Sequence, residues 1–254
     1  MSLPLFQLTG PSGWKNLFSQ DCTLCGSRSP ASVCASCVNA LPYVRATGCP
    51  HCAIEGPTGL ICGTCLAAPR AFDRTVAAFR YAYPLDRLLQ SFKFNENLAL
   101  VNLFAEALFA AVQEKQSAPD LIVPLPLARK RLAERGFNQS ALLAERVARR
   151  MGVPYIAQGL LKIRDTPPQA GLDRAARLKN VRGAFACEQS LEGKHVAIVD
   201  DVMTTGATLS VAARSLKISG AATVSTWVVA RAGREWSNLA AHDGVDAAIP
   251  FSPS

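Results

Sequence analysis

Eight of the nine cysteines in this chain form four Cys-x-x-Cys pairs within the first 70 residues. Two thiolates separated by two residues can hold one metal ion, and a second such pair completes the tetrahedral four-sulfur shell that Zn2+ prefers. The pattern repeats, because 27 residues separate Cys22 from Cys49 and 28 separate Cys34 from Cys62. The spacing therefore predicts two structural zinc sites. In the simplest, sequential pairing the ligands are Cys22, Cys25, Cys34 and Cys37 for one ion and Cys49, Cys52, Cys62 and Cys65 for the other.

Other interpretations of these cysteines carry less weight. An interleaved pairing of the four Cys-x-x-Cys pairs stays open, because spacing does not distinguish it from the sequential one. A disulfide framework is disfavoured in a reducing compartment, and a thioredoxin-like redox pair lacks the surrounding βαβ pattern. His51 is an alternative ligand inside the third pair, but that pair already supplies two sulfurs. A site closed by four sulfurs has no open position for substrate, so we expect the module to organise the fold or to bind a partner.

An acidic doublet followed by a threonine-rich turn is the second group of residues suited to chemistry. Asp200 and Asp201 come directly after the apolar residues 196–199. The turn that follows consists of Thr204, Thr205, Gly206, Ala207 and Thr208. A helix N-terminus after such a turn offers free backbone N–H groups and a positive dipole end to an anion, and a glycine lets the main chain approach closely.

Carboxylates accept hydrogen bonds from paired hydroxyls, as on a ribose, or help to hold Mg2+. The pattern therefore predicts a sugar phosphate whose hydroxyls face Asp200 and Asp201 and whose 5'-phosphate lies on the loop of residues 204–208. An ordinary strand and helix with an aspartate as the helix cap would explain one acidic residue, but neither the doublet nor the threonines.

Alternating strands and helices must position these residues, and they begin near residue 70. This alternation of strands and helices is typical of a mostly parallel α/β sheet flanked by helices. The residue Asn138 marks the start of one amphipathic helix and Gly152 its end. The acidic doublet is expected to close the strand of residues 196–199. The expected strands are 75–83, 121–126 and 196–199, and the expected helices are 98–112, 138–151 and one that opens after the threonine turn.

Length and composition exclude several classes of protein. The chain has 254 residues, of which 49% are hydrophobic and 18% charged, so it is neither disordered nor collagen-like. We expect an N-terminal segment with the cysteine module at 1–70 and an α/β domain at 71–254. The longest apolar stretch, 98–112, is shorter than the roughly 20 residues of a membrane span. The first residues lack the pattern of a secretory signal, so we expect a cytoplasmic protein.

The net charge of +8 is concentrated in one part of the chain. Residues 120–182 contain 13 Lys/Arg and 5 Asp/Glu, which accounts for the whole excess. Such a segment favours a polyanionic ligand such as phosphate, pyrophosphate or a nucleic acid backbone. A set of solvated helix faces is an equally good interpretation of charge density alone.

Two resemblances make the interpretation more specific. The segment VAIVDDVMTTGAT resembles the phosphoribosyl diphosphate (PRPP) binding motif of type I phosphoribosyltransferases. The segments VPLPLARKRLAERGFNQSALLAERVA, Arg164 with TPPQAGL, and RLKNVRGAF resemble the ComF family of competence-related proteins, as does a cysteine-rich module ahead of such a domain. The likeness runs from about Cys22 to Arg231. It implies a type I phosphoribosyltransferase-like fold with a double zinc ribbon, in a factor that handles incoming single-stranded DNA beside a helicase partner.

The resemblance also carries residue roles onto this chain. In type I enzymes the loop after the first sheet strand binds pyrophosphate, and that position falls at residues 124–131 here. The implied binding and charge-neutralising residues are Pro124, Arg129, Lys130, Arg131 and Arg135, acting with Mg2+. A solvated basic helix is the alternative for these cations. Two further family signatures match Gly136, Phe137, Asn138 and Gln139, and Arg164, Gln169, Arg177 and Asn180.

Three functional hypotheses follow. The leading one is a ComF-type protein of DNA uptake with a PRPP-like site, a basic surface for single-stranded DNA and a zinc module that docks a partner. The alternative is a metabolic phosphoribosyltransferase that acts on a small nucleobase with Mg2+ and releases pyrophosphate. The third is a regulator that binds PRPP without chemistry. The residues after Ala230 contain no recognisable acceptor site, so the sequence leaves turnover open.

Overall fold

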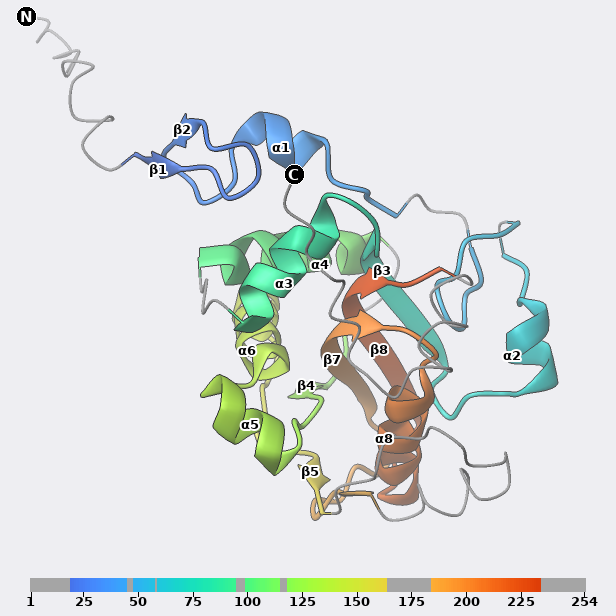
Figure 1. The fold of residues 1–254 in the computed structure, drawn as a ribbon. Coiled ribbons are helices and arrows are strands. Elements are labelled where there is room, and N and C mark those ends of the chain that lie inside the picture. Colours follow the sequence, from blue (N-terminus) through green and yellow to red (C-terminus); the bar gives the residue numbers. More distant parts are fainter. Residues whose placement is uncertain are drawn as a thin grey trace, which may run out of the picture. The chain divides into compact units, whose positions relative to one another are not determined.

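The computed structural model describes residues 19–44, 48–57, 59–94, 99–114, 118–163 and 184–233. The chain forms two compact units, Met1–Leu41 and Pro42–Ser254. The first group of four cysteines lies in the smaller unit, and the second group lies in the larger unit with the α/β sheet (Figure 1). The expected division at residue 70 stays a prediction. In the described part of the chain, no helix has both the length and the apolar character needed to cross a bilayer.

The smaller unit contains little regular structure. Strands β1 (Gln20–Asp21) and β2 (Arg28–Ser29) pair in antiparallel orientation, and the short helix α1 (Ala35–Asn39) follows. Its buried apolar residues among those described are Cys22, Val33 and Leu41. So few apolar side chains cannot offset the conformational entropy lost on ordering the chain, and the unit needs another source of stability.

A four-stranded sheet with the order β3-β8-β7-β4 forms the centre of the larger unit. All three pairings are parallel, which confirms the expected fold class. The strands are β3 (Arg74–Arg80), β4 (Leu121–Pro124), β7 (His195–Met203) and β8 (Thr223–Arg231). The apolar residues 196–199 are fully buried, as expected for a strand covered on both faces. Trp227 on β8 is also completely buried beside them.

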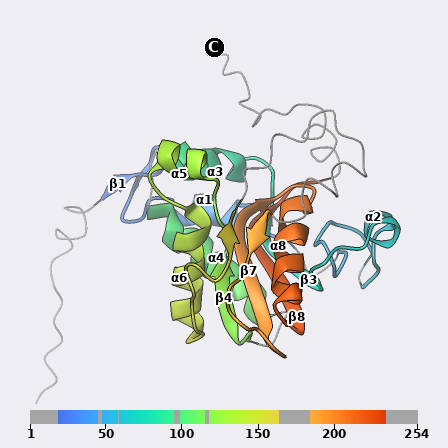
Figure 2. The ribbon, with the colours of Figure 1, turned by 90° about the horizontal axis from the view of Figure 1, so that it is seen from below.

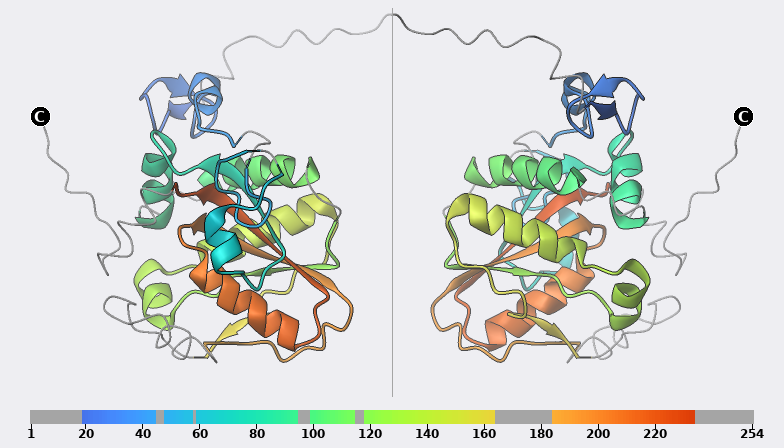
Figure 3. Two further views of the ribbon diagram at one scale, coloured as in Figure 1. Left: turned by 90° about the vertical axis from the view of Figure 1, so that its right-hand side faces the viewer. Right: turned by 90° about the vertical axis from the view of Figure 1, so that its left-hand side faces the viewer.

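Helices cover both faces of this sheet. Helices α4 and α6 contact each other and cover one face, and α8 covers the other (Figures 2 and 3). Strands β5 (Leu161–Lys162) and β6 (Phe185–Ala186) form a separate antiparallel pair. The helices are α2 (Gly63–Ala67), α3 (Leu85–Phe94), α4 (Ala99–Gln113), α5 (Arg129–Arg135), α6 (Gln139–Met151) and α8 (Ala207–Ile218).

The ends of α6 follow the expected signals. The side-chain oxygen of Asn138 accepts a hydrogen bond from the backbone N–H of Ser140 at 3.0 Å, so Asn138 caps the helix. Gly152 ends it with a φ of 68°, a left-handed conformation that glycine adopts without strain. The predicted start and end of this helix are therefore confirmed.

The expected end of strand β7 is wrong. The acidic doublet does not close the strand, because Asp200 and Asp201 lie inside it and pairing continues to Met203. Val202 and Met203 pair with Ala230 and Arg231 of β8. Strand β8 is buried to its end, so it provides a ladder for four more residues of β7 than the apolar run 196–199 alone indicates.

Candidate functional site

The cysteines form two clusters of four in sequential order. The sulfur atoms of Cys22, Cys25, Cys34 and Cys37 lie within 4.8 Å of one another, and so do those of Cys49, Cys52, Cys62 and Cys65. The Sγ atoms of Cys25 and Cys34 are 3.7 Å apart, and so are those of Cys52 and Cys62. A tetrahedral zinc with bonds of about 2.3 Å requires sulfur–sulfur distances of about 3.8 Å. Both clusters therefore fit Zn2+, and the sequential pairing is the one formed.

The two clusters repeat the same local structure. The backbone N–H of Cys34 donates to Cys22 Sγ at 3.3 Å, and that of Cys62 donates to Cys49 Sγ at 3.3 Å. The helices α1 and α2 begin directly after Cys34 and Cys62. Burial raises a thiol pKa, but hydrogen bonds from backbone N–H groups outweigh it and lower the pKa of Cys22 to about 6 and of Cys49 to about 7. Both sulfurs are thus prepared to bind metal as thiolates.

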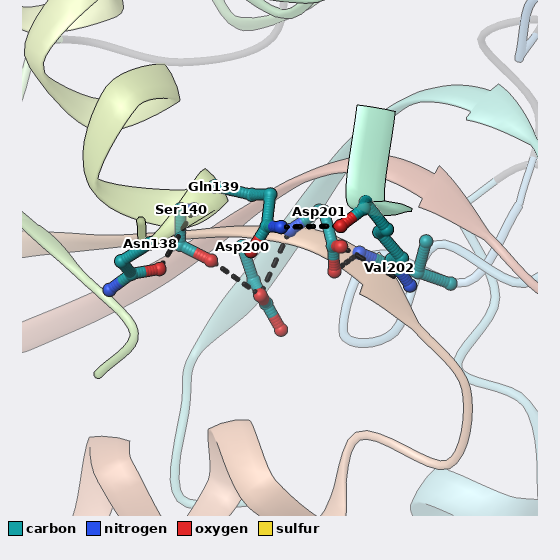
Figure 4. Close-up of polar contacts among 7 residues, drawn as sticks. Asn138, Gln139, Ser140, Asp200, Asp201 and Val202 are labelled. Carbon is teal, nitrogen blue, oxygen red and sulfur yellow. Dashed lines mark hydrogen bonds and ion pairs between the residues drawn. The ribbon is translucent and has the colours of Figure 1, made fainter. Parts of the chain in front are cut away.

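The acidic doublet lies inside β7 near its carboxyl end, next to the start of α6 (Figure 4). Asp200 Oδ1 accepts hydrogen bonds from Ser140 Oγ at 2.8 Å and from the backbone N–H of Asp201 at 2.9 Å. Asp201 Oδ1 accepts from the backbone N–H of Val202 at 2.6 Å. Its other oxygen lies 3.2 Å from the ammonium group of Lys93 on α3. The two carboxylates are therefore held in fixed and different environments.

These environments perturb the ionisation of the site. Burial and the neighbouring charge of Asp201 raise the pKa of Asp200 to about 7, against the opposing effects of Ser140 and Lys93. The negative charge of Asp201 raises the pKa of Lys93, although burial opposes it. The doublet thus combines one carboxyl group that titrates near neutral pH with one ion-paired carboxylate, and such shifts are common at functional sites.

The start of α6 connects three parts of the site. The Asn138 amide that caps the helix also donates through Nδ2 to the carbonyl of Leu125 at 3.1 Å, in the loop after β4. The buried Gln139 donates through Nε2 to the carbonyl of Lys93 at 3.4 Å. With Ser140 on Asp200, these consecutive side chains position the loop after β4, the end of α3 and the doublet. The half-buried Phe137 packs its ring 6.5 Å from that of Phe92.

The threonine turn leads directly into α8. The side chains of Thr204, Thr205 and Thr208 are exposed, and Gly206 is buried with a φ of 73°. A Cβ on Gly206 would lie 3.5 Å from the ring of Phe72, so the turn is packed from behind. Thr205 Oγ1 accepts from the backbone N–H of Ala207 at 3.3 Å. The exposed hydroxyls and the first N–H groups of a 12-residue helix together form a suitable anion site.

The basic residues after β4 lie on a helix and not in a loop. Pro124 ends β4, residues 125–128 form the loop, and α5 carries the cations. Arg129, Lys130 and Arg131 are exposed, as expected for a solvated helix face. Arg135 is partly buried, and its positive charge lowers the pKa of Lys93. The charge of Arg135 therefore acts on Lys93, the ion-pair partner of Asp201.

Two residues of the site were not identified from the sequence. Lys93 lies on an amphipathic helix, where a lysine is common and does not by itself indicate a functional site. Ser140 directly follows the family signature of residues 136–139 in the sequence. A polar serine on the buried side of an amphipathic helix was the sequence signal that could have identified it. The signature residues Arg164, Gln169, Arg177 and Asn180 lie outside the described residues.

A parallel sheet with an acidic doublet ahead of a helix N-terminus defines a phosphoribosyltransferase-type domain. Residues 138–245 match the family model of the phosphoribosyl transferase domain, and residues 14–66 match that of the double zinc ribbon domain. The larger part of the chain thus has the phosphoribosyltransferase fold, preceded by a cysteine-rich zinc module.

Curated relatives identify the family. The chain is 36% identical over 205 residues to the "DNA utilization protein YhgH" of Salmonella typhi, covering 78% of this chain and 90% of that protein. It is 30% identical over 232 residues to "Competence protein F" of Haemophilus influenzae, covering 85% and 99%. It is 32% identical over 227 residues to "Competence protein ComFC" of Bacillus subtilis, covering 84% and 91%. The chain therefore belongs to the ComF family.

Proposed function

We propose that this protein binds PRPP, or the 5'-phosphorylated end of a related ligand, and handles single-stranded DNA in the cytoplasm during DNA uptake. The ligand's ribose hydroxyls face Asp200 and Asp201, and its 5'-phosphate lies on residues 204–208. A helicase-type competence protein is the proposed partner. The names of the relatives, which refer to competence and DNA utilization, support this assignment over a metabolic transferase.

The observation that carries the proposal is the placement of the doublet relative to the turn. Asp200 and Asp201 lie near the carboxyl end of a central strand, and Gly206, the N-cap of α8, follows five residues after Asp201. Ligands of open α/β sheets bind at this edge, where hydroxyl acceptors and a helix N-terminus come together. Ser140 and Lys93 hold the acids in place before any ligand arrives, which reduces the entropic cost of binding.

The same carboxylates are oxygen ligands of the kind that Mg2+ prefers. When bound with PRPP, Mg2+ would neutralise the charge of the diphosphate. The chain's own contribution is to place the exposed cations of α5 and the partly buried Arg135 at the loop after β4, where the resemblance places the diphosphate.

Titration calorimetry tests the ligand site. PRPP with Mg2+ is expected to bind the wild-type protein, and the Asp200→Asn/Asp201→Asn double variant is expected to lose this binding. A pyrophosphate assay over a panel of nucleobases then separates binding from turnover. Pyrophosphate release with one base would favour the metabolic transferase, and the absence of any binding to the wild type would refute the proposed site.

A salt series tests the DNA surface. Binding of a single-stranded oligonucleotide is expected to weaken with salt, with a log–log slope of about −0.7 for each neutralised phosphate. The variant Arg129→Ala/Lys130→Ala should reduce the slope by roughly 1.4. Arg149→Ala is the matched control, because its guanidinium already pairs with Glu145 at 2.6 Å. Binding that does not respond to salt would remove the DNA role.

Replacing Lys93 by methionine is expected to shift the pH profile of ligand binding. The charge of Lys93 lowers the pKa of Asp200, so its removal raises that pKa further and protonates Asp200 at neutral pH. Binding of ribose 5-phosphate at pH 7 should weaken by roughly tenfold and recover in part at higher pH, because ionised acceptors bind hydroxyls more strongly. Calorimetry across pH measures this shift.

Lys217→Met provides the matched control for Lys93→Met. Lys217 pairs with Asp73 at 2.8 Å, near the amino ends of the strands and away from the doublet. This variant should leave the pH profile unchanged, and Lys93→Arg should restore most of the wild-type profile. An unshifted profile in Lys93→Met would show that Lys93 has no electrostatic effect on the doublet.

A further inference from the structure

A buried arginine at the end of β8 connects the second cysteine cluster to the threonine turn. Arg231 is only 7% exposed, although it carries a permanent charge. Its Nε donates to the carbonyl of Cys52 at 2.7 Å, and its Nη1 donates to the carbonyls of Met203 at 3.2 Å and Thr204 at 2.5 Å. Nη1 also donates to the carbonyl of Ala232. One guanidinium group therefore binds a metal-ligand residue and the first residue of the turn.

The zinc side of this connection depends on the shape of the cysteine turn. Cys52 is a member of the second cluster, and the turn that contains it closes through a 2.8 Å hydrogen bond from Ala53 N–H to the carbonyl of Cys49. The preceding carbonyl, of His51, accepts from Thr75 Oγ1 of β3 at 2.6 Å. Two successive carbonyls of the turn are thus used by the sheet. A metal bound by Cys49 and Cys52 would fix the direction in which these carbonyls point.

The segment that leaves the second cluster supports the turn a second time. The backbone N–H of Ala71 donates to Ser210 Oγ on the first turn of α8 at 3.0 Å. The ring of Phe72 is buried and packs behind Gly206 and Met203. Ala53 of the cysteine turn packs against the same apolar cluster. The proposed phosphate loop is therefore held from behind by residues on both sides of the second cluster.

We propose that Arg231 is a positioning residue that makes the order of the phosphate loop depend on zinc at the second cluster. Loss of that metal frees the Cys52 carbonyl and removes one acceptor from a buried guanidinium. The charge then has to find a new partner or reach solvent, and Arg231 releases Met203 and Thr204. The hydrogen bonds of Arg231 given above all go to residues of the larger unit, so we expect loss of the first cluster's metal to leave the loop unchanged. The consequence for ligand affinity rests on the proposed function, but the effect on the loop does not.

Hydrogen exchange of the full-length, zinc-loaded protein tests this coupling without ligand. Cys65→Ser and Cys37→Ser occupy equivalent positions in the two clusters, 28 residues apart. Each variant should lose one zinc, measured by metal analysis. Exchange of residues 203–210 should become roughly tenfold faster in Cys65→Ser and stay at the wild-type rate in Cys37→Ser. Protection of α4 serves as the folding check. Equal loop exchange in the two variants would overturn the proposal.

Arg231→Lys tests the same coupling if Cys65→Ser fails to fold. A lysine keeps the charge, but its compact ammonium group lacks the guanidinium fork that reaches both the cysteine turn and the loop. We expect this variant to keep both zinc ions while loop exchange rises. A wild-type exchange rate in Arg231→Lys overturns the positioning role. Ribose 5-phosphate titrations run in parallel separate the proposed function from the coupling between zinc and the loop. If the wild-type protein does not bind the ligand but its loop exchange still depends on zinc, only the proposed function is refuted.

Discussion

Asp200→Asn is expected to stabilise the ligand-free protein while it weakens ligand binding. Burial and Asp201 raise the pKa of Asp200 to about 7, so the folded protein resists ionisation of a group that ionises near pH 4 when unfolded. The stability associated with the protonated acid is fully present below pH 4 and is lost as the pH rises through 7. Asparagine stays neutral, and its oxygen can still accept from Ser140 and from the N–H of Asp201.

The size and measurement of this effect follow from the same linkage. At pH 8 the variant should exceed the wild type in free energy of unfolding by about 4 kcal/mol, and the difference should vanish near pH 4. Urea unfolding across this pH range measures it. Ribose 5-phosphate affinity should fall by roughly 10- to 100-fold, the cost of losing a hydrogen bond to a charged acceptor.

Asp120→Asn is the control for Asp200→Asn. Asp120 is exposed, lies at the amino end of the β4–β7 pair, and accepts from the backbone N–H of His195 at 2.7 Å. This variant should gain no stability at high pH and should keep its ligand. If the wild-type protein loses no free energy of unfolding relative to Asp200→Asn between pH 4 and pH 8, the raised pKa of Asp200 is contradicted.

Local sequence patterns predicted the parts of this molecule that depend on residues close together in the sequence. The repeat of Cys-x-x-Cys pairs indicated two clusters because each half of a site comes from one short turn. The caps of α6 at Asn138 and Gly152 were predicted for the same reason. The order of strand, turn and helix around the doublet was also predicted, since these elements follow one another directly in the chain.

Contacts between distant segments were not accessible in this way. Lys93 meets Asp201 across 108 positions of the chain, and nothing near either residue marks the pair. Ser140 on helix α6 donates to Asp200 on strand β7, and Arg231 at the end of β8 donates to the carbonyl of Cys52. The end of β7 was misplaced because pairing with β8, and not its own apolar run, determines its length. Tertiary pairing of this kind overrides local pattern.

Cys22→Ser is expected to unfold the smaller unit. Cys22 is 3% exposed, accepts from the N–H of Cys34 and lies in the first cluster. The described part of this unit buries few apolar side chains besides Val33 and Leu41, so metal binding has to supply most of its folding free energy. Structural zinc sites in small modules contribute about 10–16 kcal/mol at neutral pH. Without one ligand, the unit should lose its zinc and its structure together.

Metal analysis and amide exchange measure both parts of this expectation. The variant should retain one zinc, and amides in residues 19–41 should exchange at the rate of an unfolded chain while those of β7 and β8 stay protected. Ser27→Ala is the matched control, because its hydroxyl lies 3.0 Å from Cys25 Sγ but is not a ligand. This control should keep both ions. Protected amides in residues 19–41 of Cys22→Ser would show that the unit folds without this metal and would contradict the prediction.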